Sequence, residues 1–168
     1  MELYYSEMDS PVGTLTIVSN GEKVIRIDYG SFADLEATMT KWASHFFDKP
    51  VFIPKPEKVH HVITELRDYF QGKRQNFSFD FEYYGTPFQQ KVWKALHDTI
   101  PYGQTRTYKD IAGTIKQPKA VRAVGGAVNK NPFSIVVPCH RVIGANGKMI
   151  GYGGGLDKKE FLLTHEAK

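Results

Sequence analysis

The single cysteine, Cys139, is the residue whose surroundings are most typical of covalent chemistry. It follows the mainly apolar run 135–138, and His140 and Arg141 come directly after it. A free thiol is mostly protonated at neutral pH, and a neighbouring base or cation supplies the nucleophilic thiolate. A histidine base must itself be oriented by a carboxylate or carbonyl, and Glu166 is a candidate. The same pattern also fits an inert core cysteine, because adjacent side chains often diverge.

Residues 121–128 predict a helix with a smooth surface, built mostly from Val, Ala and Gly. A glycine in a helix costs about 1 kcal/mol relative to alanine, but it allows a close approach to another surface. That surface is either a neighbouring helix or the wall of a DNA groove, and the pattern alone does not separate the two. Arg122 is the one long cation here, and it has the length to fill a base stack after a base is extruded.

The segment Gly-Tyr-Gly-Gly-Gly at residues 151–155 is too rich in glycine for regular structure. It lacks the Lys-Ser/Thr pair that opens the helix of a phosphate-binding P-loop. Its glycines would let backbone N–H groups approach a ligand, and Tyr152 offers a flat wall. An exposed loop without a ligand is the alternative interpretation.

The charge is distributed unevenly along the chain. The net charge is +4 overall, yet residues 1–85 carry −4 and residues 86–168 carry +8. A basic half beside an acidic half favours binding of a polyanion by the second half. A solvated basic surface remains the other possibility.

Length and composition limit the classes of protein. The 168 residues suit one large or two small domains, and 41% hydrophobic with 24% charged residues is ordinary for a globular chain. No apolar run approaches the ~20 residues of a membrane span, and the N-terminus does not resemble a signal peptide. One cysteine excludes an internal disulfide and any multi-cysteine metal site. A lone thiol fits a reducing compartment, so we expect a cytoplasmic protein with no membrane contact.

The first half reads as mixed α and β structure. Residues 1–29 predict strands around the turn Ser19-Asn20-Gly21, since Asn-Gly is a strong hairpin signal. Helices are predicted over 33–47 and 59–70, separated by a proline-rich break at 49–56. Alternating phenylalanines at 77–81 predict a half-buried strand.

The second half reads as mainly helical. A helix is predicted from Thr86-Pro87, because a hydroxyl N-cap followed by proline is a typical helix start. Two shorter helices, over 107–115 and 118–129, form either a helix-turn-helix or an ordinary helical hairpin. A buried strand is predicted at 134–137. The change of character near Gly85 predicts two domains, 1–85 and 86–168.

These segments together resemble the O6-alkylguanine-DNA alkyltransferase family, from about residue 86 to 166. The most specific matches are Ile-Val-Val-Pro-Cys-His-Arg-Val at 135–142 and the Arg-Ala-Val-Gly-Gly-Ala segment within 120–131. Thr-Pro-Phe-Gln at 86–89, Thr107-Tyr108 and the 159–166 tail agree in order. The resemblance implies an α+β fold, with an RNase-H-like α/β domain followed by a mostly helical domain that contains a helix-turn-helix.

The resemblance also implies an activity: repair of O6-alkylguanine, and less efficiently of O4-alkylthymine, in double-stranded DNA. The alkyl group is transferred irreversibly to Cys139 after the base is flipped out of the duplex, so each molecule acts once. His140 would be the base, acting through a water molecule, and Glu166 would hold His140. Tyr108 would help to rotate the base and protonate guanine N3.

The remaining implied site residues contact DNA or the substrate. Arg122 would replace the flipped base, Asn131 would brace the active-site turn, and Tyr152 would stack on guanine. Lys109 and Gln117 stand where contacts to the DNA backbone are expected. In the family the helix pair enters the minor groove, which suits binding with little sequence preference.

Two positions depart from the family pattern. Gly153 lies where many relatives place a side chain, often a serine that donates to O6. The sequence therefore does not predict how large an alkyl group the site accepts. Eukaryotic members often bind zinc near the N-terminus, but no cysteine stands there in this chain. We therefore expect no bound metal. We also expect no cofactor and a protein that acts as a monomer.

Two other functions remain to be separated from alkyl transfer. One class of relatives has tryptophan in place of the cysteine and only binds lesions, and Cys139 argues against that class. A Cys–His hydrolase is the other, and the chain carries no oxyanion-hole signature for it.

Overall fold

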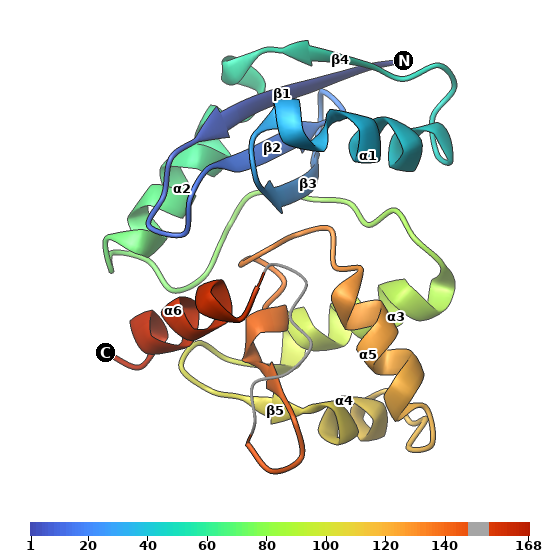
Figure 1. The fold of residues 1–168 in the computed structure, drawn as a ribbon, viewed down its shortest axis with the longest axis vertical. Helices are drawn as coiled ribbons and strands as arrows, with labels where there is room; N and C mark the ends of the chain where they lie inside the picture. Colours follow the sequence, from blue (N-terminus) through green and yellow to red (C-terminus); the bar gives the residue numbers. More distant parts are fainter. Residues whose placement is uncertain (148–154) are drawn as a thin grey trace. The chain divides into compact units, whose positions relative to one another are not determined.

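The computed structural model describes residues 1–147 and 155–168. The chain separates into two compact units, Met1–Tyr84 and Gly85–Lys168. Figure 1 traces the strand-rich first unit in blue to green and the mainly helical second unit in green to red. No helix in the described ranges is both long enough and apolar enough to cross a membrane.

The first unit is built on a four-stranded sheet with the strand order β3-β2-β1-β4. Strands β1 (Glu2–Met8), β2 (Leu15–Ser19) and β3 (Val24–Tyr29) are antiparallel neighbours, while β4 (Val51–Pro54) pairs parallel to β1. The strands predicted within 1–29 are confirmed. β4 was missed, because the prolines around it indicated a break. Proline is tolerated there since β4 lies at the edge of the sheet.

The turn between β2 and β3 depends on Asn20. Its side-chain oxygen accepts hydrogen bonds from the backbone N–H groups of Glu22 and Lys23, both at 2.9 Å. Gly21 has φ +103°, a conformation that side-chain-bearing residues avoid. The Asn-Gly signal in the sequence therefore identified the turn for a physical reason.

Two helices complete the first unit. α1 (Phe32–Ser44) is capped by Ser31, whose side chain accepts from the Asp34 N–H, and it lies against one face of the sheet (Figure 1). α2 (His60–Phe70) follows the short 3₁₀ helix η1 (Pro56–Lys58). Both predicted helices are confirmed, although α1 ends at Ser44, three residues before its predicted end. The core between the sheet and α1 contains Leu3, Val18, Ile25, Phe32, Met39 and Ala43.

The predicted strand at 77–81 is wrong. Only one isolated bridge forms, between Val24 and Phe81, and the rest of the segment is irregular. The alternation has another cause, because the phenylalanine rings pack in sequence. The centroids of Phe77 and Phe79 are 5.8 Å apart, and Phe77 lies 5.6 Å from Tyr69 of α2.

The second unit begins with two helices that have complete capping boxes. α3 (Pro87–Thr99) is capped by Thr86 and Gln89, and α4 (Tyr108–Thr114) by Thr107 and Asp110. In each box the N-cap hydroxyl accepts the N3 backbone N–H, and the N3 side chain accepts the N-cap N–H. Both helices start where the sequence predicted. The short strand β5 (Arg106–Thr107) leads directly into α4.

α5 (Val121–Asn129) packs against α3 and α4 and forms the helix-turn-helix with α4 (Figure 1). It begins three residues later than predicted, after a turn at 117–120. Trp93 of α3 is nearly fully buried and donates its indole N–H to the Ala127 carbonyl at 2.8 Å. This hydrogen bond ties α5 to α3 at the centre of the unit.

The segment after α5 differs from its prediction. Residues 134–137 are buried as expected, but they form a turn rather than a strand. They lead into a 3₁₀ helix, η2 (Cys139–Arg141), and a short strand, β6 (Val142–Ile143), which pairs parallel to β5. The last helix, α6 (Leu156–Glu166), contacts η2.

A tight contact at the start of the second unit gives a stability prediction. A Cβ added to Gly85 would lie 2.6 Å from the ring of Trp93, which is nearly fully buried and cannot move freely. We expect Gly85→Ala to lower the free energy of unfolding by about 1–3 kcal/mol. Gly113, in α4, has open space around its Cβ position, so Gly113→Ala is expected to be neutral or stabilising by up to ~1 kcal/mol. Denaturant unfolding measures both, and equal effects would contradict the packing argument.

Candidate active site

Cys139 is the first residue of η2, and Pro138 separates it from the buried turn 134–137. Its exposed fraction is 7%, so the residue is buried. Its backbone N–H donates to the Val137 carbonyl at 2.8 Å, and the Arg141 N–H donates to the Pro138 carbonyl at 3.0 Å. The cysteine is therefore held by the backbone on both sides.

Asn131 is the side chain that holds this turn in shape. Its oxygen accepts the Phe133 N–H at 2.9 Å, and its amide donates to the Val137 carbonyl at 2.7 Å and to Cys139 Sγ at 3.1 Å. The amide nitrogen also lies 3.3 Å from the Phe133 carbonyl. One side chain thus links the beginning of the turn, its end and the sulfur atom.

The turn contains a strained residue. Ile135 has φ +75°, a left-handed conformation that is unfavourable for a β-branched side chain. Such a conformation costs about 1–3 kcal/mol and persists only where the surroundings enforce it. Ile135 is buried at 1% exposure, and the Asn131 hydrogen bonds close the turn around it.

His140 is fully buried and faces the end of α6. Its Nε2 lies 2.8 Å from Oε2 of Glu166. Burial lowers the pKa of His140, and the hydrogen bond from its ring to Glu166 opposes this only in part. The imidazole is therefore neutral at neutral pH. Within the described part of the chain, His140 Nδ1 has no hydrogen-bond partner.

Glu166 is shared by two side chains. Burial alone raises the pKa of its carboxyl, but hydrogen bonds from His140 and Arg141 outweigh burial and hold that pKa well below its usual range. The carboxylate is ionised and can only accept, so the proton between the two groups belongs to His140 Nε2. A neutral His140 then has an unprotonated Nδ1, which is the form that acts as a base.

Two further ionisable groups lie within electrostatic range of Cys139. Tyr108, at the start of α4, has its pKa raised by burial and by Cys139, so its hydroxyl stays protonated. Lys159, in α6, is buried and donates to the Val142 carbonyl at 2.5 Å. Burial lowers the pKa of Lys159 and Cys139 opposes that effect. The thiol thus has a protonated phenol and an amine nearby.

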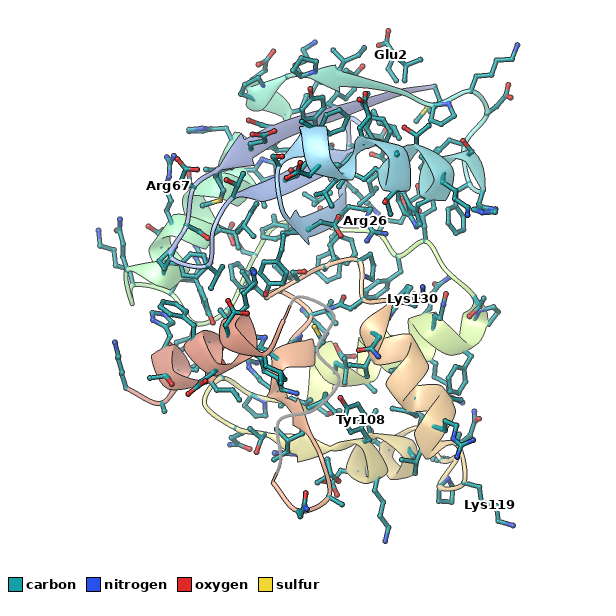
Figure 2. The ribbon with its side chains drawn as sticks, in the orientation of Figure 1. Glu2, Arg26, Arg67, Tyr108, Lys119 and Lys130 are labelled. Carbon is teal, nitrogen blue, oxygen red and sulfur yellow. The ribbon has the colours of Figure 1, made fainter. Side chains whose placement is uncertain are left out.

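The helix-turn-helix supplies an exposed basic surface. Arg122 and Lys109 are exposed on α5 and α4, and Gln117 is exposed in the turn between them. Figure 2 labels Lys119 and Lys130, which precede and follow α5. Gly125 of α5 lies beside the ring of Tyr108, and an added Cβ would be 3.9 Å from that ring, an ordinary van der Waals contact. Of the predicted contacts to DNA, Lys109 and Arg122 thus lie on the two helices and Gln117 lies in the turn between them.

The structure brings together Cys139, His140, Glu166, Tyr108 and Asn131, all of which the sequence analysis named. Tyr152 and Gly153 lie outside the described residues. Sequence reasoning assigned no role to Arg141 or Lys159. The signal for Lys159 was its helical spacing with Leu162 and Glu166, which places a lysine on the buried face of α6.

No group of three or more metal-ligating side chains occurs in residues 1–147 and 155–168.

Two family models match the chain and divide it between them. The ribonuclease-like domain of 6-O-methylguanine DNA methyltransferase matches residues 3–83, and the DNA binding domain of the same family matches residues 87–168. Together they cover nearly the whole chain.

Individual proteins agree with the family models. A methylated-DNA–protein-cysteine methyltransferase from Mycobacterium bovis is 43% identical over 164 residues, which are 98% of this chain and 92% of that protein. One from Haemophilus influenzae is 45% identical over 166 residues, covering 98% of this chain and 86% of that protein.

Solved structures agree as well. The crystal structure of Mycobacterium tuberculosis O6-methylguanine methyltransferase superposes with a TM-score of 0.83 at 42% identity, covering 98% of this chain and 93% of that one. The structure of the M. tuberculosis OGT in complex with DNA has a TM-score of 0.83 at 39% identity, with 99% and 93% coverage.

By fold and by sequence, the chain falls in the class of DNA-repair alkyltransferases, in which a ribonuclease-like unit precedes a DNA-binding helical unit. It belongs to the 6-O-methylguanine DNA methyltransferase family. The predicted family and the predicted α+β fold class are confirmed.

The contacts of Asn131 predict its contribution to stability. Asn131→Ala removes the hydrogen bonds that close the strained turn, and we expect the free energy of unfolding to fall by roughly 1–3 kcal/mol. Asn129 is exposed at the end of α5, so Asn129→Ala should change it by less than about 0.5 kcal/mol. Denaturant unfolding of both variants is the measurement. An Asn131 variant as stable as the Asn129 variant would show that the turn does not depend on this side chain.

Proposed function

We propose that the protein repairs O6-alkylguanine in double-stranded DNA, and less efficiently O4-alkylthymine, by transferring the alkyl group to Cys139. The observation that carries this proposal is the buried His140, whose Nε2 is bonded to an ionised Glu166 while its Nδ1 has no partner in the described residues. A base of this kind next to the sole cysteine suits the activation of a thiol.

The chemistry balances with these side chains and water as the proton carrier. His140 takes the thiol proton through a water molecule, and the sulfur attacks the alkyl carbon. The bond between that carbon and O6 breaks, its electron pair stays with guanine, and the Tyr108 hydroxyl gives a proton to N3. The products are a thioether on Cys139 and a dealkylated guanine whose new proton shifts from N3 to N1 through solvent, while the proton held by His140 passes through water to restore the Tyr108 phenol. No group in this scheme cleaves the thioether, so each molecule reacts once.

Access to the alkyl carbon requires the base to leave the duplex, at a cost of a few kcal/mol. Arg122 is exposed on α5 and would fill the vacated position, while Lys109 and Gln117 would contact the DNA backbone. Asn131 would keep the active-site turn closed during the transfer. Tyr152 would stack on the extruded guanine, with Gly153 beside it. The flexible length of arginine and its permanent charge suit the role of Arg122.

The two units are proposed as two domains with their boundary in the chain near Gly85, and the second carries the alkyl acceptor and the DNA-binding helices. The protein is proposed to act as a monomer. The thiol must stay reduced to react, which favours a reducing compartment such as the cytoplasm.

The identity of the acceptor gives the first prediction. After incubation with duplex DNA that carries O6-methylguanine, intact protein should gain the mass of one methylene, because CH3 replaces H, and peptide mapping should place it on Cys139. Cys139→Ala should gain nothing and leave the lesion in place. Binding of lesion DNA without a mass gain would favour the lesion-binding alternative. Removal of more than one methyl group per molecule would contradict a stoichiometric acceptor.

The role of Arg122 gives the second prediction. Arg122→Ala should slow repair of duplex DNA by roughly tenfold or more, since base extrusion costs a few kcal/mol, but it should leave reaction with free O6-alkylguanine base nearly unchanged. Lys41→Ala, which removes an exposed cation from α1, is the matched control and should leave both rates unchanged. Single-turnover rates on the two substrates are compared. An equal loss on both substrates would exclude a role in base extrusion.

A further inference from the structure

Arg141 is a buried cation that the proposed mechanism does not use. Its exposed fraction is 7%, and each of its three guanidinium nitrogens donates a hydrogen bond to the protein. Nε donates to Glu166 Oε1 at 2.7 Å, and Nη2 donates to Glu166 Oε2 at 3.0 Å. Nη1 donates to the Ile100 carbonyl at 2.7 Å, and the guanidinium carbon lies 5.7 Å from the ring centroid of Tyr102.

This arrangement fixes the carboxylate of Glu166 in one orientation. Arginine binds both carboxylate oxygens through a rigid planar fork, which is more restrictive than a single hydrogen bond. The third donor of the fork is held by the end of α3 through Ile100. The adjoining turn also approaches the end of α6, because a Cβ added to Gly103 would be 3.3 Å from the Glu166 carbonyl. The chain after α3 therefore supports Arg141, which in turn supports Glu166.

Arg141 and His140 meet on the same oxygen atom. Oε2 of Glu166 lies 2.8 Å from His140 Nε2 and 3.0 Å from Arg141 Nη2. A permanent positive charge at this range disfavours a second one on the imidazole, and Arg141 does lower the pKa of His140. It also cancels part of the negative charge on Glu166 that would otherwise favour a protonated His140.

The other charged groups around His140 also shift its pKa. From α6, Glu166 raises the pKa of His140 and Lys159 lowers it, while burial remains the largest cause of its low value. Cys139 precedes His140 on η2. Arg141 is the group that touches the carboxylate and opposes its effect on the imidazole.

We propose that Arg141 is a positioning residue for alkyl transfer: it fixes and neutralises Glu166 so that His140 is held in the uncharged form that accepts the Cys139 proton. This inference rests on the proposed function. When the thiol S–H bond breaks, the proton goes to His140 Nδ1, the pair becomes an imidazolium bonded to Glu166, and Glu166 itself stays unprotonated.

The test compares Arg141→Met, which removes the charge and the fork, with Arg141→Lys, which keeps the charge. The measurement is the rate of alkyl transfer from free O6-alkylguanine base as a function of pH. In Arg141→Met, the ratio of the rate at pH 8 to that at pH 6 should rise by roughly threefold or more over the wild type, because loss of a nearby charge lets His140 protonate at higher pH. Arg141→Lys should give a smaller change in this ratio.

A purely structural role gives a different result. It would lower the rate by the same factor at every pH and leave the ratio unchanged, and that outcome overturns the proposal. A larger change of the ratio in Arg141→Lys than in Arg141→Met overturns it too.

A second readout does not depend on activity. Titration of the His140 ring followed by NMR in folded wild type and folded Arg141→Lys should show protonation at higher pH in the variant, since a single ammonium cannot occupy both Glu166 oxygens. Unchanged titration contradicts the proposal, even if Arg141→Met fails to fold. Absence of alkyl transfer in the wild type would instead refute the proposed function, so the two failures are distinguishable.

Discussion

The organisation of the site depends on one buried carboxylate. Glu166 receives hydrogen bonds from His140 and from both ends of the Arg141 fork, and these contacts join the end of α6 to η2 and to the end of α3. A buried carboxylate without partners is strongly unfavourable. The buried position of Glu166 therefore depends on its hydrogen bonds from both His140 and Arg141. Because this set fixes the protonated nitrogen of His140, the tertiary structure of the second unit determines the chemistry available at Cys139.

The turn that carries Cys139 adds a second constraint. Ile135 is held in an unfavourable conformation, and the hydrogen bonds of Asn131 close the turn around it and reach the sulfur atom. Strained backbone of this kind is found where the position of a side chain matters more than stability. Here the gain is a thiol that is shielded and held at one place beside a base.

Local chemistry explains which elements the sequence predicted. Thr86 with Gln89, Thr107 with Asp110, and Asn20 with Gly21 are short-range signals, and the structure shows the hydrogen bonds behind them. The strand predicted at 134–137 was wrong, because an apolar run signals burial but not the conformation that a distant side chain imposes. The sequence also did not predict the role of Arg141. Its partners lie 25 and 41 residues away, and no local pattern reports them.

The most direct test of this account is the protonation state of His140. Nitrogen NMR of the histidine ring in the unreacted protein at neutral pH distinguishes the two neutral tautomers and the charged form. The account predicts a neutral ring that carries its proton on Nε2, facing Glu166, with Nδ1 unprotonated. A ring protonated on Nδ1 alone, or a charged imidazolium at neutral pH, would contradict it.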